Sequence, residues 1–159
     1  MRILALDQAL QTTGWAIFED RKLIDCGKFV VEKKGSMAER LHRIQQEIAK
    51  ILFDKEDGEI DFIVFEGIQN QSNNETFKKL AYVQAAIMLF CYQAMIDFSI
   101  LAPSEWRKLN GGGYGKTRIE QKENAIEKVK QWYSLEVDSD TADAINIGRA
   151  YLNFLQSAF

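Results

Sequence analysis

Hydrophobic and polar positions divide the chain into short extended runs and longer stretches with helical periodicity. The extended runs predict five strands, at residues 2–7, 15–19, 23–31, 61–65 and 99–102. The helical periodicity predicts four helices, at residues 36–53, 76–97, 117–133 and 139–157, with a short helical turn at 103–109. Three strands in succession, then strands alternating with helices, predict an α/β fold. We expect a mixed five-stranded sheet with an antiparallel hairpin edge and helices on both faces.

Two of the predicted helices begin with a capping box, the Ser/Thr-x-x-Glu pattern that satisfies backbone N–H groups of the first turn. Ser36 is followed by Glu39, and Thr117 is followed by Glu120. The last helix is expected to be capped by Asp138 or by the serine after it.

The length of 159 residues and the hydrophobic content of 47% predict one domain over residues 1–159 with a substantial core. The chain has no apolar span of 18 residues and lacks the basic start of a signal peptide. Cys26 and Cys91 are far apart and form no metal-binding pair. These features together predict a reduced, cytoplasmic protein.

The overall charge weighs against a nucleic-acid partner, because the net charge is −3 and the isoelectric point is near 5.3. However, residues 103–130 carry seven basic and four acidic side chains, a local net charge of +3. Taken alone, this segment has two interpretations: a solvated helix face of mixed charge, or a surface that contacts phosphates.

Four acidic residues stand out from their surroundings. Asp7 and Glu66 each follow four apolar residues, as when a buried strand emerges at its carboxyl end. Asp140 and Asp143 lie three residues apart at the start of the last predicted helix, which places their Cβ atoms about 5–6 Å apart on one face. The first and fourth strands can be parallel neighbours, and open α/β sheets bind ligands at the carboxyl ends of strands. A terminal helix packed across that edge then brings the four acids together.

Grouped carboxylates repel one another and resist burial unless a cation lies between them. Hard oxygen ligands of this kind suit Mg²⁺ or Mn²⁺. The acids therefore predict a divalent metal site. Asp140 also has a competing interpretation as a first-turn acid, which interacts with the helix dipole by about 0.3–1 kcal/mol.

The order and spacing of several motifs resemble a known family. The motifs are Leu4-Ala5-Leu6-Asp7, Thr13-Gly14-Trp15-Ala16, Phe65-Glu66, Ala102-Pro103-Ser104 and Asp140-Thr141-Ala142-Asp143-Ala144. Together they cover nearly the whole chain and resemble the RuvC-type Holliday junction resolvases of the ribonuclease H-like nuclease superfamily. The resemblance implies a ribonuclease H-like sheet and a metal-dependent endonuclease that resolves four-way DNA junctions by paired symmetric nicks. It also implies catalytic and metal-binding roles for Asp7, Glu66, Asp140 and Asp143.

Phosphodiester hydrolysis in this family implies two divalent ions about 3.5–4 Å apart, one activating water and one stabilising the leaving oxygen. We expect Mg²⁺, with Mn²⁺ able to substitute. Asp7 is expected to bridge the ions, with Glu66 on one ion and the two helix acids on the other. In a DNA nuclease, the basic segment would line the path of the phosphates, and Tyr114 is expected to stack on a base. The candidate DNA contacts are Arg107, Lys108, Tyr114, Lys116, Arg118 and Lys122.

The predicted helix at 76–97 is apolar on most sides, which indicates burial on more than one side. The resemblance implies a homodimer, and two-fold symmetry suits the two symmetric nicks of a four-way junction. This helix is therefore the expected dimer surface. The alternative is a helix enclosed wholly within the monomer.

Two positions depart from the family pattern. Ser139 stands where family members often carry His, and Gln69 stands where many carry an aromatic residue at the junction centre. A base-stacking aromatic contributes roughly 1–3 kcal/mol, which Gln69 does not supply. We therefore expect relaxed sequence preference at the crossover.

Other functions fit parts of the sequence. A ribonuclease H acting on RNA–DNA hybrids and a non-catalytic junction-binding module are both alternatives with this fold. An actin-like phosphotransferase also begins with a strand, an Asp and a Thr-Gly turn, but it needs two such domains. Residues 110–117 differ at one position from a phosphate-binding P-loop, and the residues before them make a poor strand. Trp106 is expected in the core or at its rim, with contact to DNA as the alternative.

Overall fold

Five strands form one mixed sheet in the order β3-β2-β1-β4-β5. They are β1 (Arg2–Asp7), β2 (Thr12–Glu19), β3 (Lys22–Val30), β4 (Phe62–Glu66) and β5 (Asp97–Leu101). The first three strands pair antiparallel, β4 is parallel to β1, and β5 is parallel to β4. This computed structural model describes residues 1–53, 58–69 and 73–157. The predicted α/β fold, with its mixed sheet and antiparallel edge, is confirmed.

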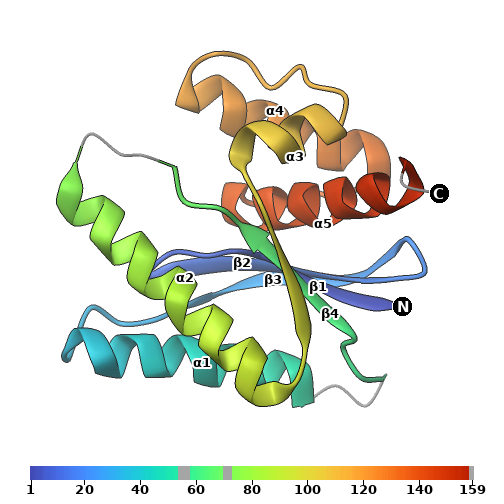
Figure 1. Cartoon of the computed structure of the whole chain (residues 1–159). Helices are drawn as coiled ribbons and strands as arrows, with labels where there is room; N and C mark the ends of the chain where they lie inside the picture. The colour runs from blue at the N-terminus through green and yellow to red at the C-terminus, as the bar shows by residue number, and fades with distance from the viewer. Residues whose placement is uncertain (54–57, 70–72, 158–159) are drawn as a thin grey trace.

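Helices cover both faces of the sheet (Figure 1). α1 (Met37–Phe53) and α2 (Asn74–Ala94) lie on one face. On the other side lie α3 (Pro103–Leu109), α4 (Arg118–Tyr133) and α5 (Ser139–Ser157), with α5 directly against the strands. The capping boxes predicted at Ser36 and Thr117 are both present. None of the described helices is long and apolar enough to cross a membrane.

α2 begins and ends earlier than the predicted helix at 76–97. The side chain of Asn73 caps its first turn by accepting from the backbone N–H groups of Glu75 and Thr76, at 3.0 and 3.3 Å. Its last turn ends at Met95, which adopts the left-handed conformation with φ 54°. Because the chain turns at Met95, Asp97 already belongs to β5.

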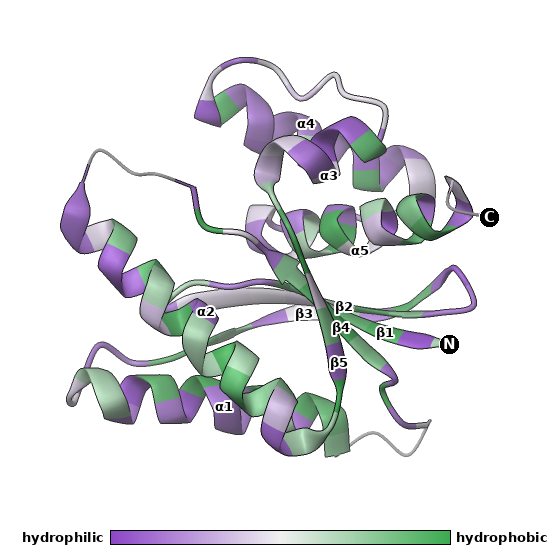
Figure 2. Cartoon of the chain, in the orientation of Figure 1, coloured by the Kyte–Doolittle hydropathy of each residue, from purple (hydrophilic) through white to green (hydrophobic). Residues whose placement is uncertain are grey.

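The central strand contributes to two separate cores. Ile3 and Ala5 of β1 pack with residues of α5, whereas Leu4 and Leu6 pack with residues of α1 and α2. This alternation follows from the two-residue period of a strand, and a strand buried on both faces reads as a continuous apolar run. In Figure 2, α4 is mainly hydrophilic, as expected for a helix that packs along one side only.

α5 approaches the sheet closely at Gly148. A Cβ atom on this residue would lie 2.3 Å from the Phe18 ring and 2.9 Å from the side chain of Ala5. Any larger residue would therefore push α5 away from the strands. The close packing keeps the first turn of α5 at the edge where β1 ends.

Candidate active site

Asp7 and Glu66 leave the sheet side by side. β1 and β4 are parallel neighbours, and Leu6 pairs with Phe65 in their register, so the acids that follow them lie at the same edge. The side-chain amide of Gln8 joins the two strand ends. Its oxygen accepts from the backbone N–H of Glu66 at 3.1 Å, and its nitrogen donates to the Glu66 carbonyl. The structure thus brings the two strand-end acids together.

The first turn of α5 lies against the same edge. Asp138 caps this helix, because its carboxylate accepts from the backbone N–H groups of Asp140 and Thr141, at 3.1 and 3.2 Å. Gly14, which pairs with Asp7 in the β1–β2 ladder, lies against the backbone of Asp140. A Cβ atom on Gly14 would lie 1.9 Å from the Asp140 carbonyl oxygen. Only glycine permits this contact, which sets Asp140 beside the end of β1.

The four carboxylates share one electrostatic environment. Burial raises the pKa of Asp7 well above its usual range, and repulsion from the other three acids, Asp143 first, raises it further. The pKa of Asp143 is raised to about 7, first by burial and then by Glu66. Burial also raises the pKa of Glu66. The acids are therefore close enough to repel one another, although among the described residues no three His, Cys, Asp or Glu side chains enclose a single ion position.

A buried tryptophan holds Glu66. The indole N–H of Trp106 donates to Oε1 of Glu66 at 2.8 Å, and Trp106 is only 1% exposed. This bond favours the charged carboxylate and lowers the pKa of Glu66 against the effect of burial. The expected core position of Trp106 is confirmed, and the alternative of contact with DNA is wrong. The bond to Glu66 was not predicted, since nothing in the local sequence links α3 to the end of β4.

Two cations of the basic segment reach the acids. Nζ of Lys122 lies 3.2 Å from Oγ of Ser139 and 4.0 Å from Oδ1 of Asp140. Arg107 stacks its guanidinium on the neighbouring indole, 4.8 Å from the ring centroid. Both cations favour the charged form of Asp143. Lys122 and Arg107 therefore lower its pKa, in opposition to burial and to the neighbouring acids, which raise it.

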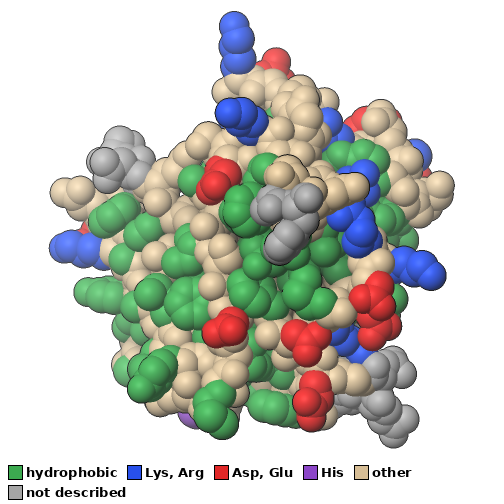
Figure 3. Space-filling view, turned by 45° about the vertical axis from the view of Figure 1, so that its right-hand side comes forward, with side chains coloured by type: hydrophobic (Ala, Val, Ile, Leu, Met, Phe, Trp, Pro, Cys, Tyr) green, Lys and Arg blue, Asp and Glu red, His purple; other side chains and the backbone are tan. Residues whose placement is uncertain are grey.

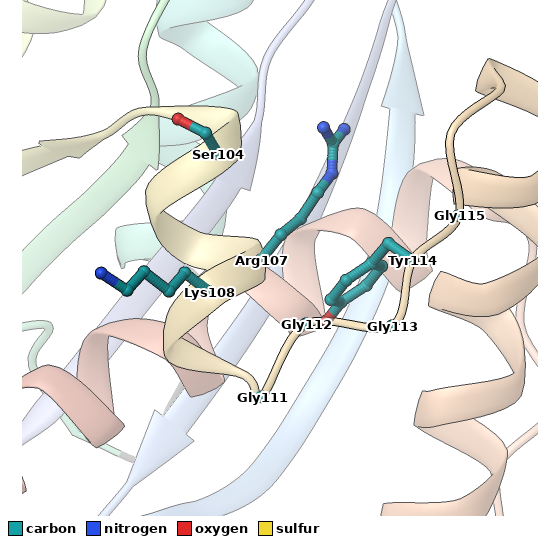
Figure 4. Close-up of a pocket in the computed structure, with 8 residues that line it drawn as sticks. All are labelled: Ser104, Arg107, Lys108, Gly111, Gly112, Gly113, Tyr114 and Gly115. Carbon is teal, nitrogen blue, oxygen red and sulfur yellow. The ribbon is translucent and has the colours of Figure 1, made fainter.

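The glycine-rich loop after α3 borders a shallow hollow of about 540 Å³ (Figure 4). Arg107 and Lys108 line its α3 side, and Figure 4 shows the two side chains leaving the helix in different directions. Lys116 and Arg118 are exposed at the far end of the loop. Gly111, like the two glycines that follow it, has a positive φ, so the loop turns without side chains in the opening. It follows a helix rather than a strand, which is not the setting of a P-loop.

Tyr114 does not face solvent, so the prediction that it stacks on a base is wrong. It is 3% exposed, and its hydroxyl accepts from Nδ2 of Asn110 at 3.2 Å and donates to Oδ1 of Asn146 at 2.5 Å. Its ring lies edge-on to the Trp106 ring, with the centroids 5.2 Å apart. The phenol therefore fastens the loop to α5, one turn beyond Asp143.

Comparison with known proteins identifies one family. A family model described as "Crossover junction endodeoxyribonuclease RuvC" matches residues 3–150. A protein with that description from Fusobacterium nucleatum is 27% identical, covering 99% of this chain and 83% of its own length. Another from Rickettsia akari is 28% identical, covering 92% and 94%. The solved structure "T. thermophilus RuvC in complex with Holliday junction substrate" matches with a TM-score of 0.79 at 15% identity, covering 99% of this chain and 96% of that one. The family resemblance and the ribonuclease H-like fold are confirmed.

Proposed function

This chain belongs to the RuvC family of crossover junction endodeoxyribonucleases, and we propose that it resolves four-way DNA junctions by paired nicks that require a divalent metal ion. The proposal rests on one observation: four acids at one edge of the sheet lie close enough to repel one another electrostatically, and the Lys122 ammonium lies beside them. A module that only bound DNA would benefit from losing these acids, because they repel phosphate. The acid cluster therefore favours a nuclease.

The donor set fits hard divalent cations, since all its members are carboxylates. We assign Asp7, Glu66, Asp140 and Asp143 as ligands of two Mg²⁺ ions, with Mn²⁺ able to substitute. Such a pair, when bound, supplies an activated water and neutralises charge on the phosphoryl group. To bind cations, the side chains must rotate toward a common position and release the protons that burial and repulsion favour.

The residues around the acids orient them and balance their charge. Trp106 engages one oxygen of Glu66, which leaves the second oxygen for a cation. Asp7 ends the central strand of the sheet, between β2 and β4, and is therefore our candidate for a ligand shared by both ions. Asp143, whose pKa burial and the neighbouring acids raise to about 7, must lose its proton to bind a cation. Lys122 is positioned to neutralise a phosphate that approaches the acids.

We assign one path of the DNA to the basic side chains between α3 and α4. They are Arg107, Lys108, Lys116, Arg118 and Lys122. Tyr114 leaves this set because it is buried. Each phosphate that these cations neutralise releases counterions, so binding is expected to weaken steeply as salt rises.

We also propose that α2 forms the surface of a homodimer, because a four-way junction calls for two symmetric nicks. Val83, Ile87 and Cys91 of α2 are buried against its own sheet. On its surface, Tyr92 is 82% exposed and Met95 is 93% exposed, which contradicts a helix enclosed wholly within the monomer. Two further apolar side chains of α2, Tyr82 and Leu89, are 49% and 53% exposed, and Figure 3 shows one face of the molecule with a broad hydrophobic area. An apolar face of this kind supports a partner helix.

The decisive test compares a labelled four-way junction with linear duplex and with RNA–DNA hybrid, in Mg²⁺ or in chelator. We expect symmetric paired nicks in the junction alone, in Mg²⁺ alone, and none with Asp7→Asn or Glu66→Gln. Both variants should still bind the junction and keep the circular dichroism spectrum of the wild type. Equal cutting of the hybrid would favour a ribonuclease H, and junction binding without cutting under any divalent ion would indicate a binding module.

A further inference from the structure

A second hollow is lined by residues of α1 and α2, the helices that lie across the sheet from α3 and α4 (Figure 1). Its volume is about 440 Å³. It is bounded by residues 9–11, which begin two positions after Asp7, and by the first turns of α1 and α2. Leu10 and Leu80 give it an apolar floor. The molecule therefore has one hollow against α3 and another against α1 and α2, on opposite sides of the sheet.

Three cations surround this floor: Lys33, Arg40 and Lys79. None of the described residues that line the hollow is acidic. Arg40 is anchored there, since its Nη2 donates to the carbonyl of Leu10 at 3.2 Å. Its Nε is buried and, within the described ranges, has no hydrogen-bond partner. A buried donor left in this way lowers stability, and an acceptor that reached it would recover that loss.

Two acids on the first turns of α1 and α2 have other partners. Glu39 accepts from the backbone N–H of Ser36 at 2.6 Å, and Glu75 pairs with Lys78 at 3.5 Å. The amino-terminal ends of α1 and α2 add to the positive potential. Asn73 already accepts N–H groups of the first turn of α2, so the side chains, rather than the helix amides, are left to contact an anion.

We propose that this hollow holds the sugar and phosphate of one nucleotide in the DNA strand that continues past the acid cluster. The apolar floor suits the sugar, and the three cations suit its phosphate. A strand gripped on both sides of the acids is held in place where the carboxylates would otherwise repel it. The inference takes its ligand, a DNA strand, from the proposed function, but it concerns a contact on the opposite side from α3 and α4.

The test is the salt dependence of junction binding by the full chain, measured in chelator so that no strand is cut. The double variant Lys33→Gln/Lys79→Gln is compared with the wild type. Loss of this one phosphate contact lowers the slope of log affinity against log salt by about 0.9. Between about 0.05 and 0.2 M salt, the wild type should then lose about three- to fourfold more affinity than the double variant.

Lys50→Gln is the matched control, because Lys50 is exposed on α1 and pairs with Glu47 at 2.6 Å, away from the hollow. It should keep the wild-type slope. A double variant with the slope of the wild type would overturn this inference while leaving the proposed function intact. A wild type that binds junctions no better than linear duplex would instead count against the proposed function. In that case, comparing the salt slopes of the wild type and the double variant on linear duplex would still show whether the hollow contacts a phosphate. Absence of any DNA binding would overturn both.

Discussion

The indole N–H of Trp106 donates to Oε1 of Glu66 at 2.8 Å, from a side chain that solvent does not reach. The bond fixes the carboxylate in one orientation and keeps its second oxygen available. Arg107 stacks on the other side of this contact, against the indole ring. Glu66 is thus held by a donor that carries no charge and cannot compete with a metal ion for the site.

Trp106→Phe keeps an aromatic ring but removes the N–H donor together with part of the buried indole. We expect it to lower the rate of junction cleavage, or to raise the Mg²⁺ concentration required, by about tenfold to a hundredfold, as is typical when a group that orients a metal ligand is lost. The loss of stability should be on the order of 2–3 kcal/mol, because the lost hydrogen bond and the smaller buried ring both contribute. Titrating Mg²⁺ at fixed junction concentration measures the effect. The control is Trp132→Phe, at a ring of α4 that stacks with Arg149. An unchanged Mg²⁺ requirement for Trp106→Phe would show that Trp106 does not orient Glu66 for metal binding.

Asp143 makes the stability of the ion-free protein depend on pH. Its pKa is raised from 3.8 to about 7, so the folded state binds this proton more tightly than the unfolded chain. The resulting stabilisation is fully present below about pH 4 and is lost as the pH rises through about 7. Asp143→Asn removes that dependence. In chelator at pH 8, we therefore expect the variant to be more stable than the wild type by on the order of a few kcal/mol.

Urea unfolding between pH 4 and pH 8 measures this difference, which should shrink steadily toward pH 4. Glu123→Gln, an exposed change on α4, should follow the wild type across the series. A gap between Asp143→Asn and the wild type that stayed constant with pH would show that Asp143 is not the group responsible.

Gly14 sets the distance between the end of β1 and the first turn of α5. In Gly14→Ala, the new methyl group would meet the Asp140 carbonyl oxygen at 1.9 Å, and backbone cannot rotate aside as a side chain can. We expect a loss of about 1–3 kcal/mol in stability and a larger loss of cleavage than of junction binding, because Asp140 moves away from Asp7. Gly27→Ala, whose methyl would meet the Trp15 ring at 3.0 Å, is the comparison. Cleavage by Gly14→Ala equal to that by Gly27→Ala would contradict this account.

The strand-end acids could be predicted from sequence because local signals specify them. β1 and β4 are apolar runs buried on both faces, and each ends in an acid. The start of α5 was equally predictable, since Asp138 is a strong capping residue. These signals place three elements at one edge before any long-range contact is known.

The partners of the acids could not be predicted, because they depend on contacts between distant segments. Trp106 and Glu66 are 40 positions apart, and no periodicity connects them. Tyr114 was expected at the surface because it lies in a glycine-rich loop, but its hydroxyl finds a buried partner on α5. α2 ends at Met95 without the glycine that normally marks such a turn, so the predicted helix ran too far.

Gln69 lies exposed just after the end of β4, where many family members place an aromatic residue. Without a base-stacking ring, we expect cleavage rates to vary little across a panel of junctions with different crossover sequences. Gln69→Phe should sharpen the preference, by up to about tenfold between favoured and disfavoured sequences, since stacking contributes roughly 1–3 kcal/mol. Wild-type cutting confined to one short consensus would contradict the first expectation.

The exposed face of α2 predicts how the protein assembles. Leu89 and Tyr92 lie three positions apart on this helix and are 53% and 82% exposed, so both project from the same surface. Leu89→Glu/Tyr92→Glu would place charge in the proposed interface without disturbing the core. We expect sedimentation to report a monomer with an unchanged circular dichroism spectrum, and junction cleavage to lose the coordination of its two nicks. Val30→Glu, on strand β3 at the opposite edge of the sheet, should remain dimeric. If the double variant also stayed dimeric, the dimer interface would not lie on α2. If it were a monomer that made single, uncoordinated nicks, paired cleavage would depend on this helix.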